Sequence, residues 1–454
     1  MSIVTINPAT GEDLRRYPTF SEDEIEERLT RADAAFRRHR TTSFADRAQR
    51  MNRAADLLEE RADAMSQTMT REMGKPVGQA RAEVRKCAWV CRYYAEHAED
   101  FLADEPVDTD ASTSYVAYEP LGPVLAVMPW NFPVWQVFRF AAPALMAGNV
   151  ALLKHAPNVT GTALDIEELL RDAGFNSDEF QALVVEVEQV EGIIADERVK
   201  AATLTGSVGA GQAVGGQAAA QVKPSVLELG GSDPFIVLAD ADLDLALAKG
   251  ITARMQNNAQ SCIAAKRFIL ERPIAEAFIE RFTERVEQMT LGNPMNEGID
   301  LGPLAREDLC DTVHDQVQRS IEQGATCVTG GVVPERNGFY YAPTVLTDVA
   351  PGNVAFEEEI FGPVASMVLA DDADHAVELA NDTRFGLGGS VFTRDTDRGE
   401  AVARRLEVGC AFVNEMVKSD PRLPFGGIKD SGYGRELSRH GIREFVNIKT
   451  VWVA

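Results

Sequence analysis

Residues 201–231 read AATLTGSVGAGQAVGGQAAAQVKPSVLELGG, and this stretch contains the pattern that decides the fold. It opens on a short apolar run, passes through a glycine-rich turn and continues at helix length over 208–221. A second apolar run, SVLELGG, closes it at 225–231. A strand, a helix and a strand in this order predict a βαβ unit, whose two strands lie parallel in one sheet.

The same alternation continues on both sides of this unit. The other strands expected near it are NVALLK (149–154), ALVVEV (182–187) and PFIVLAD (234–240), with helices near 160–173 and 189–198. A second series of strands is expected at KRFILE (266–271), TCVTGG (326–331), SMVLA (366–370), GGSVFT (388–393) and CAFVNE (410–415), with helices near 273–289, 305–323 and 396–406. Two such α/β series in tandem predict two α/β domains.

The part of the chain before these series is predicted to be mainly helical. Ser21 and Glu24 form a capping-box pattern that begins one helix. A second helix is expected over about 43–73 and a third over about 79–100. Apolar residues around a Pro/Gly turn at 113–130 then predict a hairpin that leads into a buried strand.

The charge balance narrows the classes of partner. The 454 residues include 70 acidic and 45 basic side chains, which gives a net charge of -25. Such a field repels DNA, RNA and anionic membranes, so neither a nucleic-acid nor a membrane partner is expected. The opening MSIVTINPATGEDL shows no signal-peptide pattern, and a cytoplasmic protein is expected. Only ten of the basic residues are lysines, and an acidic, lysine-poor surface predicts a halophilic, salt-rich setting.

Cys262 has unusual neighbours, because it lies in QNNAQSCIAAK (256–266) among amides and small residues. A free cysteine more often behaves as a small buried hydrophobe, and composition alone leaves that alternative open. The six cysteines form no CxxC pattern, and the six histidines fall outside metal-ligand spacing. Neither a disulfide framework nor a metal site is therefore expected.

Three further motifs suggest chemistry. LTGSVGAG (204–211) lies between a strand and a helix, where backbone amides attract anionic oxygen, although a plain tight turn is the alternative. Glu228 ends a strand at the edge where open α/β sheets bind ligands, although it could be a solvated charge. PWNFP (129–133) places Asn131 on a rigid turn, where its amide could donate to an oxyanion or could cap its own turn.

Six motifs together carry a resemblance that no single one supports. They are PWNFP, LTGSVGAG, LELGG (227–231), NNAQSC (257–262), EEIFGPV (358–364) and PFGGIKDSGYGRE (424–436). In this order they resemble the aldehyde dehydrogenase superfamily over essentially the whole chain. The segments KHAPN, VLELGGSDPFIVL and RELSRHGIREFVNIKTVW are most similar to the short succinate-semialdehyde dehydrogenases.

The resemblance implies a Rossmann-like NAD(P)-binding domain, an α/β catalytic domain and a small β oligomerisation arm. The implied bounds are 1–103 and 121–229 for the cofactor domain, 230–434 for the catalytic domain, and 104–120 and 435–454 for the arm and tail. Family members exchange strands through such an arm, so a homodimer or homotetramer is expected. Exposed strand edges tend to pair with strands of other chains, which agrees with the expected oligomer.

The implied reaction is the oxidation of a small aldehyde, expected to be succinate semialdehyde, to its acid with NAD or NADP and without a metal. Cys262 matches the family's nucleophile, whose thiolate adds to the carbonyl to form a thiohemiacetal. Asn131 and the backbone N–H of Cys262 would hold the oxyanion. Glu228 matches the general base that activates water against the later thioester.

Other positions carry over as binding residues. The implied cofactor-binding residues are Trp130, Lys154, Thr205, Gly206, Ser207, Leu229, Gly230, Glu359 and Phe361. The implied substrate-binding residues are Arg139, Ser419 and Phe425, with Arg139 holding the far carboxylate. Glu436 matches a second carboxylate that some members use in a proton relay.

Three positions depart from the family pattern. Ala259 replaces a common glycine and should stiffen the approach to Cys262, and Gln256 replaces a second carboxylate-binding arginine of some members. Pro157 occupies the position where NAD-preferring members often have Glu, so a 2′-phosphate would not be repelled and NADP should be accepted at least as well as NAD. The alternatives are a dehydrogenase for another small aldehyde, an acylating enzyme that uses coenzyme A, and a catalytically silent binding homologue.

Overall fold

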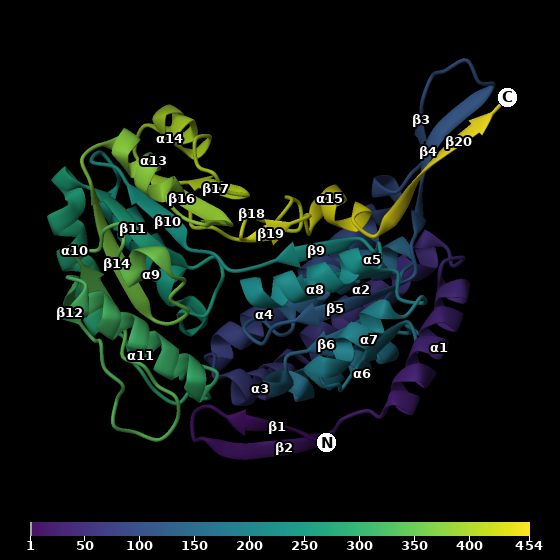
Figure 1. Cartoon of the computed structure of the whole chain (residues 1–454), viewed down its shortest axis with the longest axis horizontal. Helices are drawn as coiled ribbons and strands as arrows, with labels where there is room; N and C mark the ends of the chain where they lie inside the picture. The colour runs from purple at the N-terminus through teal and green to yellow at the C-terminus, as the bar shows by residue number, and fades with distance from the viewer. Residues whose placement is uncertain (1) are drawn as a thin grey trace.

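Two α/β lobes and a projecting β arm make up the molecule (Figure 1). The computed structural model describes residues 2–454, so Met1, the first residue of the predicted cofactor domain, lies outside the described residues. One lobe is built on a six-stranded sheet and the other on a seven-stranded sheet. The predicted α/β class with two parallel sheets is confirmed.

The six-stranded sheet contains the βαβ unit from which the fold was predicted. Its strand order is β19-β9-β8-β5-β6-β7, and only β19 runs antiparallel to its neighbour. The strands are β5 (Pro123–Met128), β6 (Val150–His155), β7 (Phe180–Ala182), β8 (Ala201–Thr205), β9 (Ser225–Glu228) and β19 (Gly432–Tyr433). Thr205 pairs with Glu228 in the parallel register of β8 and β9, so the ends of both strands reach the same edge of the sheet.

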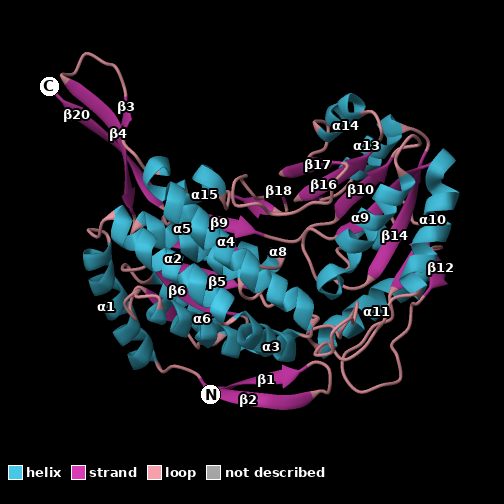
Figure 2. Ribbon diagram, turned by 180° about the vertical axis from the view of Figure 1, so that it is seen from behind, coloured by secondary structure: helices cyan, strands magenta, loops and turns pink. Residues whose placement is uncertain are grey.

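Helices bury this sheet on both faces (Figure 2). Val124 and Ala126 of β5 face one layer of helices, whereas Leu125 faces the other, as the two-residue period of a strand requires. The first layer contains α2 (Phe44–Glu60), α3 (Ala62–Met73), α4 (Val77–Phe101), α5 (Trp135–Ala147) and α6 (Thr160–Asp172). The second contains α1 (Glu22–His39), α7 (Val190–Ala195) and α8 (Val208–Ala220). The predicted capping box of Ser21 and Glu24 begins α1.

The seven-stranded sheet has the order β12-β13-β14-β11-β10-β16-β17, and only β12 is antiparallel. Its strands are β10 (Asp233–Val237), β11 (Ala265–Glu271), β12 (Thr326–Thr329), β13 (Thr344–Thr347), β14 (Val364–Ala370), β16 (Gly388–Phe392) and β17 (Cys410–Val413). One face packs on α9 (Leu243–Met255) and α10 (Arg272–Glu287). The other packs on α11 (Glu307–Glu322), α12 (Val354–Glu357), α13 (Ala373–Asn381) and α14 (Thr396–Ala403).

The arm consists of β4 (Thr113–Pro120) between β20 (Val446–Val453) and β3 (Glu105–Pro106), all antiparallel. The predicted hairpin at 113–130 is therefore wrong, since β4 and β5 enter different sheets. The two runs differ in burial: β5 is almost wholly buried between parallel neighbours, whereas β4 is only partly covered. The chain changes direction at Gly122, whose φ of 145° suits glycine.

Two other predictions differ from the structure. The helix expected over 43–73 is divided at Arg61, where φ of -101° and ψ of 9° interrupt the helix between α2 and α3. The strand expected at 182–187 is instead β7, which ends at Ala182. Leu183 and Val185 are buried in the core without belonging to a strand, so their apolar character reflects packing rather than sheet pairing.

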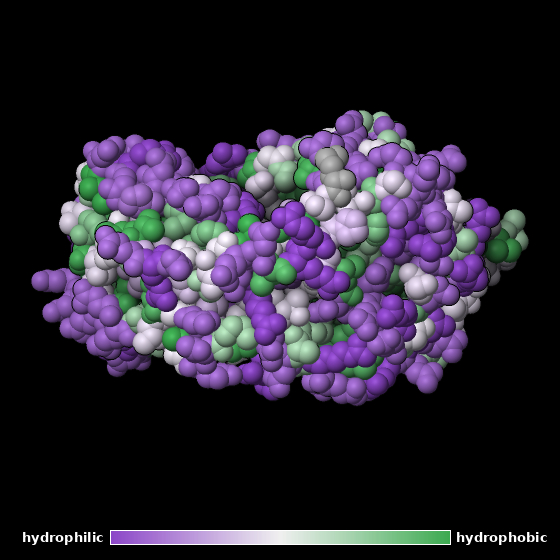
Figure 3. Space-filling view, turned by 90° about the horizontal axis from the view of Figure 1, so that it is seen from below, coloured by the Kyte–Doolittle hydropathy of each residue, from purple (hydrophilic) through white to green (hydrophobic). Residues whose placement is uncertain are grey.

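Shorter elements connect the lobes or lie at their edges. They are the ribbon of β1 (Ser2–Asn7) and β2 (Glu12–Pro18), the pair β15 (Phe385–Gly386) and β18 (Ile428–Lys429), and α15 (Ser438–Arg443). The face in Figure 3 carries mainly hydrophilic residues with hydrophobic ones scattered among them. Within residues 2–454, every helix is too short or too polar to cross a membrane.

Candidate active site

Two cavities meet at Cys262, which among residues 2–454 is the single residue that lines both. One cavity has a volume of about 410 Å³ and lies among α4, α5 and the segment 416–425. The other has a volume of about 350 Å³ and lies at the carboxyl edge of the six-stranded sheet. They are called the α4 cavity and the sheet-edge cavity below. The arrangement places one cysteine on the wall of two separate spaces.

The sheet-edge cavity gathers eight of the nine predicted cofactor-binding residues. They are Trp130, Thr205, Gly206, Ser207, Leu229, Gly230, Glu359 and Phe361. The rings of Trp130 and Phe361 meet edge to face with centroids 5.8 Å apart. Ser207 caps α8, whose N-terminus is a suitable site for phosphate oxygen. This collection of groups fits a dinucleotide.

Lys154, the ninth residue, lies at the end of β6 outside that lining. It is buried, and desolvation lowers the pKa of its ammonium group, although Glu186 and Glu188 partly oppose the shift. Pro157 follows at the start of a short 3₁₀ turn and brings no carboxylate to the site. A buried cation of this kind suits an anionic group of a ligand.

The loop before Cys262 has a strained backbone. Asn257, Asn258 and Ala259 all adopt left-handed φ values, of 59°, 54° and 60°. Asparagine tolerates this region better than most residues, and hydrogen bonds of its amide hold it there. Asn257 donates to the carbonyl of Asn131 at 2.8 Å, and Asn258 donates to the carbonyl of Gly74 at 2.8 Å. The amides around Cys262 are thus explained by loop conformation, and Ala259 occupies a position that glycine would adopt with less strain.

Arg254 ties this loop to the loop that carries Glu359 and Phe361. Its side chain is fully buried and donates to the carbonyls of Ile360 at 2.9 Å and Val364 at 2.5 Å. Further bonds reach the carbonyls of Gly362 and Ala259. Nothing in the sequence indicates this role, because an arginine near a helix end more often serves as a surface charge.

We expect Arg254→Met to lower the free energy of unfolding by about 3 kcal/mol or more, because several buried carbonyls lose their donor. Urea denaturation at fixed protein concentration measures the change. Arg272→Met is the matched control, since Arg272 is exposed and its ion pair with Asp371 should contribute less than about 1 kcal/mol. Equal effects of the two substitutions would contradict the assignment.

Asn131 is held in place from two sides. Its Nδ2 donates to the carbonyl of Gln260 at 3.0 Å, which leaves the second N–H of the amide for another acceptor. The carboxylate of Glu83 on α4 accepts from the backbone N–H groups of Val134 and Trp135, both at 2.9 Å. The helix that follows Asn131 is therefore anchored at its first turn, and the predicted oxyanion donor lies on a fixed support.

The Cys262 thiol is protonated in this environment. Loss of solvation raises its pKa to about 12, although Arg139 and Lys266 partly oppose the shift. Lys266 donates to the Cys262 carbonyl at 2.8 Å and pairs with Glu359 at 3.1 Å. The sulfur must therefore lose its proton when it attacks a substrate carbon.

Glu228 is buried and lies outside the linings of both cavities. Neither carboxyl oxygen has a hydrogen-bond partner among the described residues. Burial raises its pKa well above the ordinary value; the charge of Arg139 opposes this shift and that of Glu436 adds to it. A buried carboxyl group without partners is a common feature of catalytic acids and bases.

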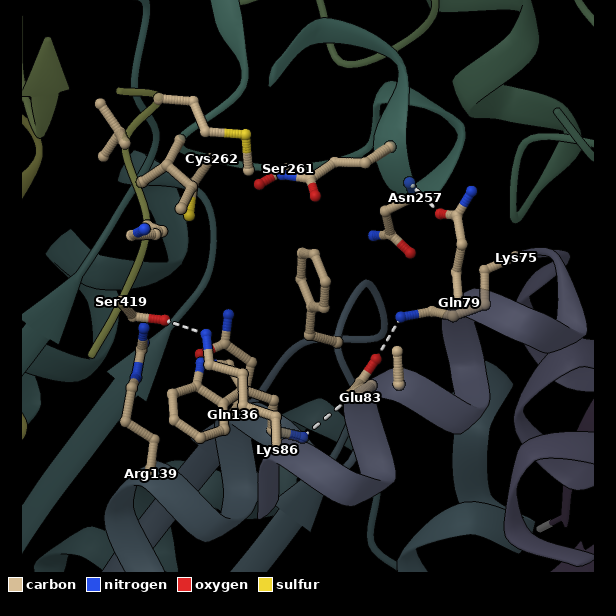
Figure 4. A pocket seen from close by; sticks show the side chains of 18 of the residues that line it. Lys75, Gln79, Glu83, Lys86, Gln136, Arg139, Asn257, Ser261, Cys262 and Ser419 are labelled. Carbon is tan, nitrogen blue, oxygen red and sulfur yellow. Dashed lines mark hydrogen bonds and ion pairs between the residues drawn. The ribbon is translucent and has the colours of Figure 1, made fainter. Parts of the chain in front are cut away.

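The predicted substrate-binding residues Arg139, Ser419 and Phe425 all line the α4 cavity (Figure 4). Arg139 is buried on α5, and its guanidinium lies 4.8 Å from the centre of the Phe425 ring. It forms an ion pair with Glu436 and donates to Thr205 Oγ1 at 3.3 Å. The structure therefore places Glu436 against Arg139, outside both cavities.

In the part of the chain that the structure describes, no group of three or more His, Cys, Asp or Glu residues could hold a metal ion.

Comparisons with known proteins identify the family. Residues 1–451 match the model described as the aldehyde dehydrogenase family. A probable succinate-semialdehyde dehydrogenase [NADP(+)] of Synechocystis sp. is 53% identical over 454 residues, and the match covers 100% of both chains. A succinate-semialdehyde dehydrogenase [NADP(+)] of Mycobacterium leprae is 52% identical over 457 residues, again with 100% of both chains covered. The crystal structure of succinic semialdehyde dehydrogenase from Streptococcus pyogenes, in complex with NADP+, has a TM-score of 0.97 at 35% identity and covers 99% of each chain.

Proposed function

Because the chain belongs to the aldehyde dehydrogenase family, we propose that it oxidises succinate semialdehyde to succinate with NADP+. The observation that carries this proposal is the meeting of two cavities at Cys262, one suited to a dinucleotide and the other lined by cations. The names of relatives that are 52% and 53% identical over their full length support the substrate and the cofactor.

In the proposed reaction, the sulfur of Cys262 forms a bond with the aldehyde carbon as its proton passes to solvent water. The carbonyl oxygen becomes an oxyanion, which the free N–H of Asn131 and the backbone N–H of Cys262 stabilise. A bound nicotinamide dinucleotide would supply the acceptor for the hydride of this carbon, and loss of that hydride would leave a thioester on Cys262. Glu228 then takes a proton from water, whose oxygen attacks the thioester carbon and releases the acid and the thiol.

We propose NADP as the preferred cofactor on the basis of Lys154 and Pro157. The buried ammonium group of Lys154 can form an ion pair with the 2′-phosphate of NADP. The negative charge of this phosphate balances the positive charge of the ammonium group. Pro157 leaves no carboxylate at this point to repel that phosphate. NAD would gain nothing from the cation, so the expected difference between the cofactors lies mainly in their KM values.

We also propose that residues 1–103 and 121–229 form the cofactor-binding unit, that 230–434 form the catalytic unit, and that the arm and tail join subunits into a homodimer or homotetramer. Ile448, Trp452 and Val453 of β20 are 64%, 51% and 49% exposed, which supports a partner for the arm.

A cytoplasmic setting is supported by six free cysteines, one of them the proposed nucleophile. A salt-rich setting is supported by the net charge of -25.

A panel of aldehydes tests the proposed function. We expect kcat/KM to be highest for succinate semialdehyde with NADP, lower with NAD, and lower again for butanal, which has the same carbon length and no carboxylate. Free succinate should be the product even when coenzyme A is present. A preference for neutral aldehydes would refute the substrate, and a coenzyme A thioester product would favour the acylating alternative.

A further inference from the structure

Four cationic side chains line the α4 cavity, and three of them already have a carboxylate partner. Lys75 pairs with Glu83, and Lys418 pairs with Glu415 at 3.1 Å. The third, Arg139, pairs with Glu436. Their charges are therefore largely neutralised before any ligand arrives.

Lys86 is the fourth cation, and within residues 2–454 its ammonium group forms no ion pair. It extends from α4 and donates to Ser419 Oγ at 2.7 Å, as the dashed line in Figure 4 shows. Its ammonium also lies 4.1 Å from the centre of the Trp135 ring. An aromatic face and a hydroxyl fix the position of this charge but do not neutralise it.

We propose that Lys86, together with Ser419, receives the far carboxylate of the substrate and is the residue that selects a carboxylated aldehyde. This inference rests on the proposed function and deepens it. The ammonium has further N–H groups to donate, and the Ser419 hydroxyl, which accepts from Lys86, can donate its own hydrogen to a carboxylate oxygen. Arg139 remains a neighbouring positive charge, but its ion pair with Glu436 reduces what it can offer a substrate.

The electrostatics of the whole chain make such a cation necessary. A protein with a net charge of -25 repels an anionic substrate unless its site provides local positive charge. Much of the remaining wall is apolar and includes Phe132, Ile263 and Val417. One unneutralised ammonium in a cavity with a partly apolar wall fits an aldehyde with a short carbon chain and a terminal carboxylate.

Lys86→Met tests the inference, because methionine retains most of the side-chain length and removes the charge. We expect kcat/KM for succinate semialdehyde to fall roughly 30-fold or more, through KM, while butanal is oxidised with little change. Lys86→Arg should recover part of the loss, since it restores a cation. Lys200→Met, a surface substitution with the same change in net charge, controls for the general field.

The outcomes separate the two proposals. If the unmodified enzyme does not prefer succinate semialdehyde to butanal, the proposed substrate and this inference both fail. If the preference exists but Lys86→Met lowers the activity on both aldehydes equally, or on neither, the proposed function stands and the role of Lys86 is refuted.

The pH dependence gives a second readout. Burial lowers the pKa of Lys86 to about 8, and Arg139 on α5 adds to the shift. The other groups that face it, Glu83 and Cys87 on α4 and Asp420 on the adjoining segment, act in the opposite direction. The cation is therefore present below about pH 8 and lost above it. We expect the ratio of KM values, succinate semialdehyde over butanal, to rise through this range, and a flat ratio would contradict the inference.

Discussion

Cys262→Ala is expected to abolish the oxidation of succinate semialdehyde, with a loss of kcat/KM on the order of 10⁴-fold or more. Without the sulfur no thiohemiacetal forms, and hydride has no covalent intermediate to leave from. NADPH formation at high enzyme concentration measures the residual rate. Cofactor binding should change little, since Cys262 is one of many residues that line the sheet-edge cavity.

Cys327→Ala is the matched control for this substitution. Cys327 lies on β12 at the edge of the seven-stranded sheet, outside the linings of both cavities. The Cys327→Ala variant should retain full turnover, which would show that the loss of activity in Cys262→Ala is specific to that thiol. Turnover that persists in Cys262→Ala would refute the nucleophile, and a loss of cofactor binding would point to a collapsed site instead.

Glu228→Gln is expected to lower steady-state turnover by about 10²- to 10⁴-fold, because the amide cannot take a proton from water. The steps before hydrolysis should survive. Rapid mixing should therefore show a burst of about one NADPH for each active site, followed by a slow phase. Mass spectrometry of the quenched enzyme should find an acyl group on Cys262.

The pH profile provides an independent check on Glu228. Its pKa is raised by burial, so the fraction of ionised base, and with it the rate of hydrolysis, should increase as the pH rises through that pKa. Glu228→Gln should lose this dependence. Glu400→Gln, which removes an exposed charge on α14, should behave as the unmodified enzyme does. If Glu228→Gln also removed the burst, the carboxylate would be needed before the thioester forms.

The sequence predicted the parts of the site that depend on local pattern. The βαβ unit at 201–231 fixed the parallel sheet, and the motifs around Asn131 and Cys262 identified residues that the structure brings to the same cavities. These features follow from short-range spacing, such as an apolar run followed by a glycine-rich turn. The structure also brings together in one cavity Arg139, Ser419 and Phe425, whose role in substrate binding stays a prediction.

What the sequence could not predict depends on pairs that are far apart in the chain. Arg139 and Glu436 form an ion pair although they are far apart in the chain, and nothing near either residue in the sequence indicates it. Lys86 has an ordinary place on an amphipathic helix, and its functional interest comes from the absence, among the described residues, of an ion pair with Glu83 or Asp420. The hairpin predicted at 113–130 failed for a similar reason, because the partner of β4 is the C-terminal strand.

In the part of the chain that the structure describes, the two cavities share one residue. Each cavity has its own exposed lining residue, Lys418 in the α4 cavity and Ser207 in the sheet-edge cavity. The aldehyde can therefore enter through the α4 cavity and the dinucleotide through the sheet-edge cavity, and the two molecules meet at Cys262. The acid product can leave before the reduced dinucleotide does. An inhibitor that occupies one cavity leaves the other cavity accessible. An inhibitor that fills the α4 cavity would compete with the aldehyde but not with the dinucleotide.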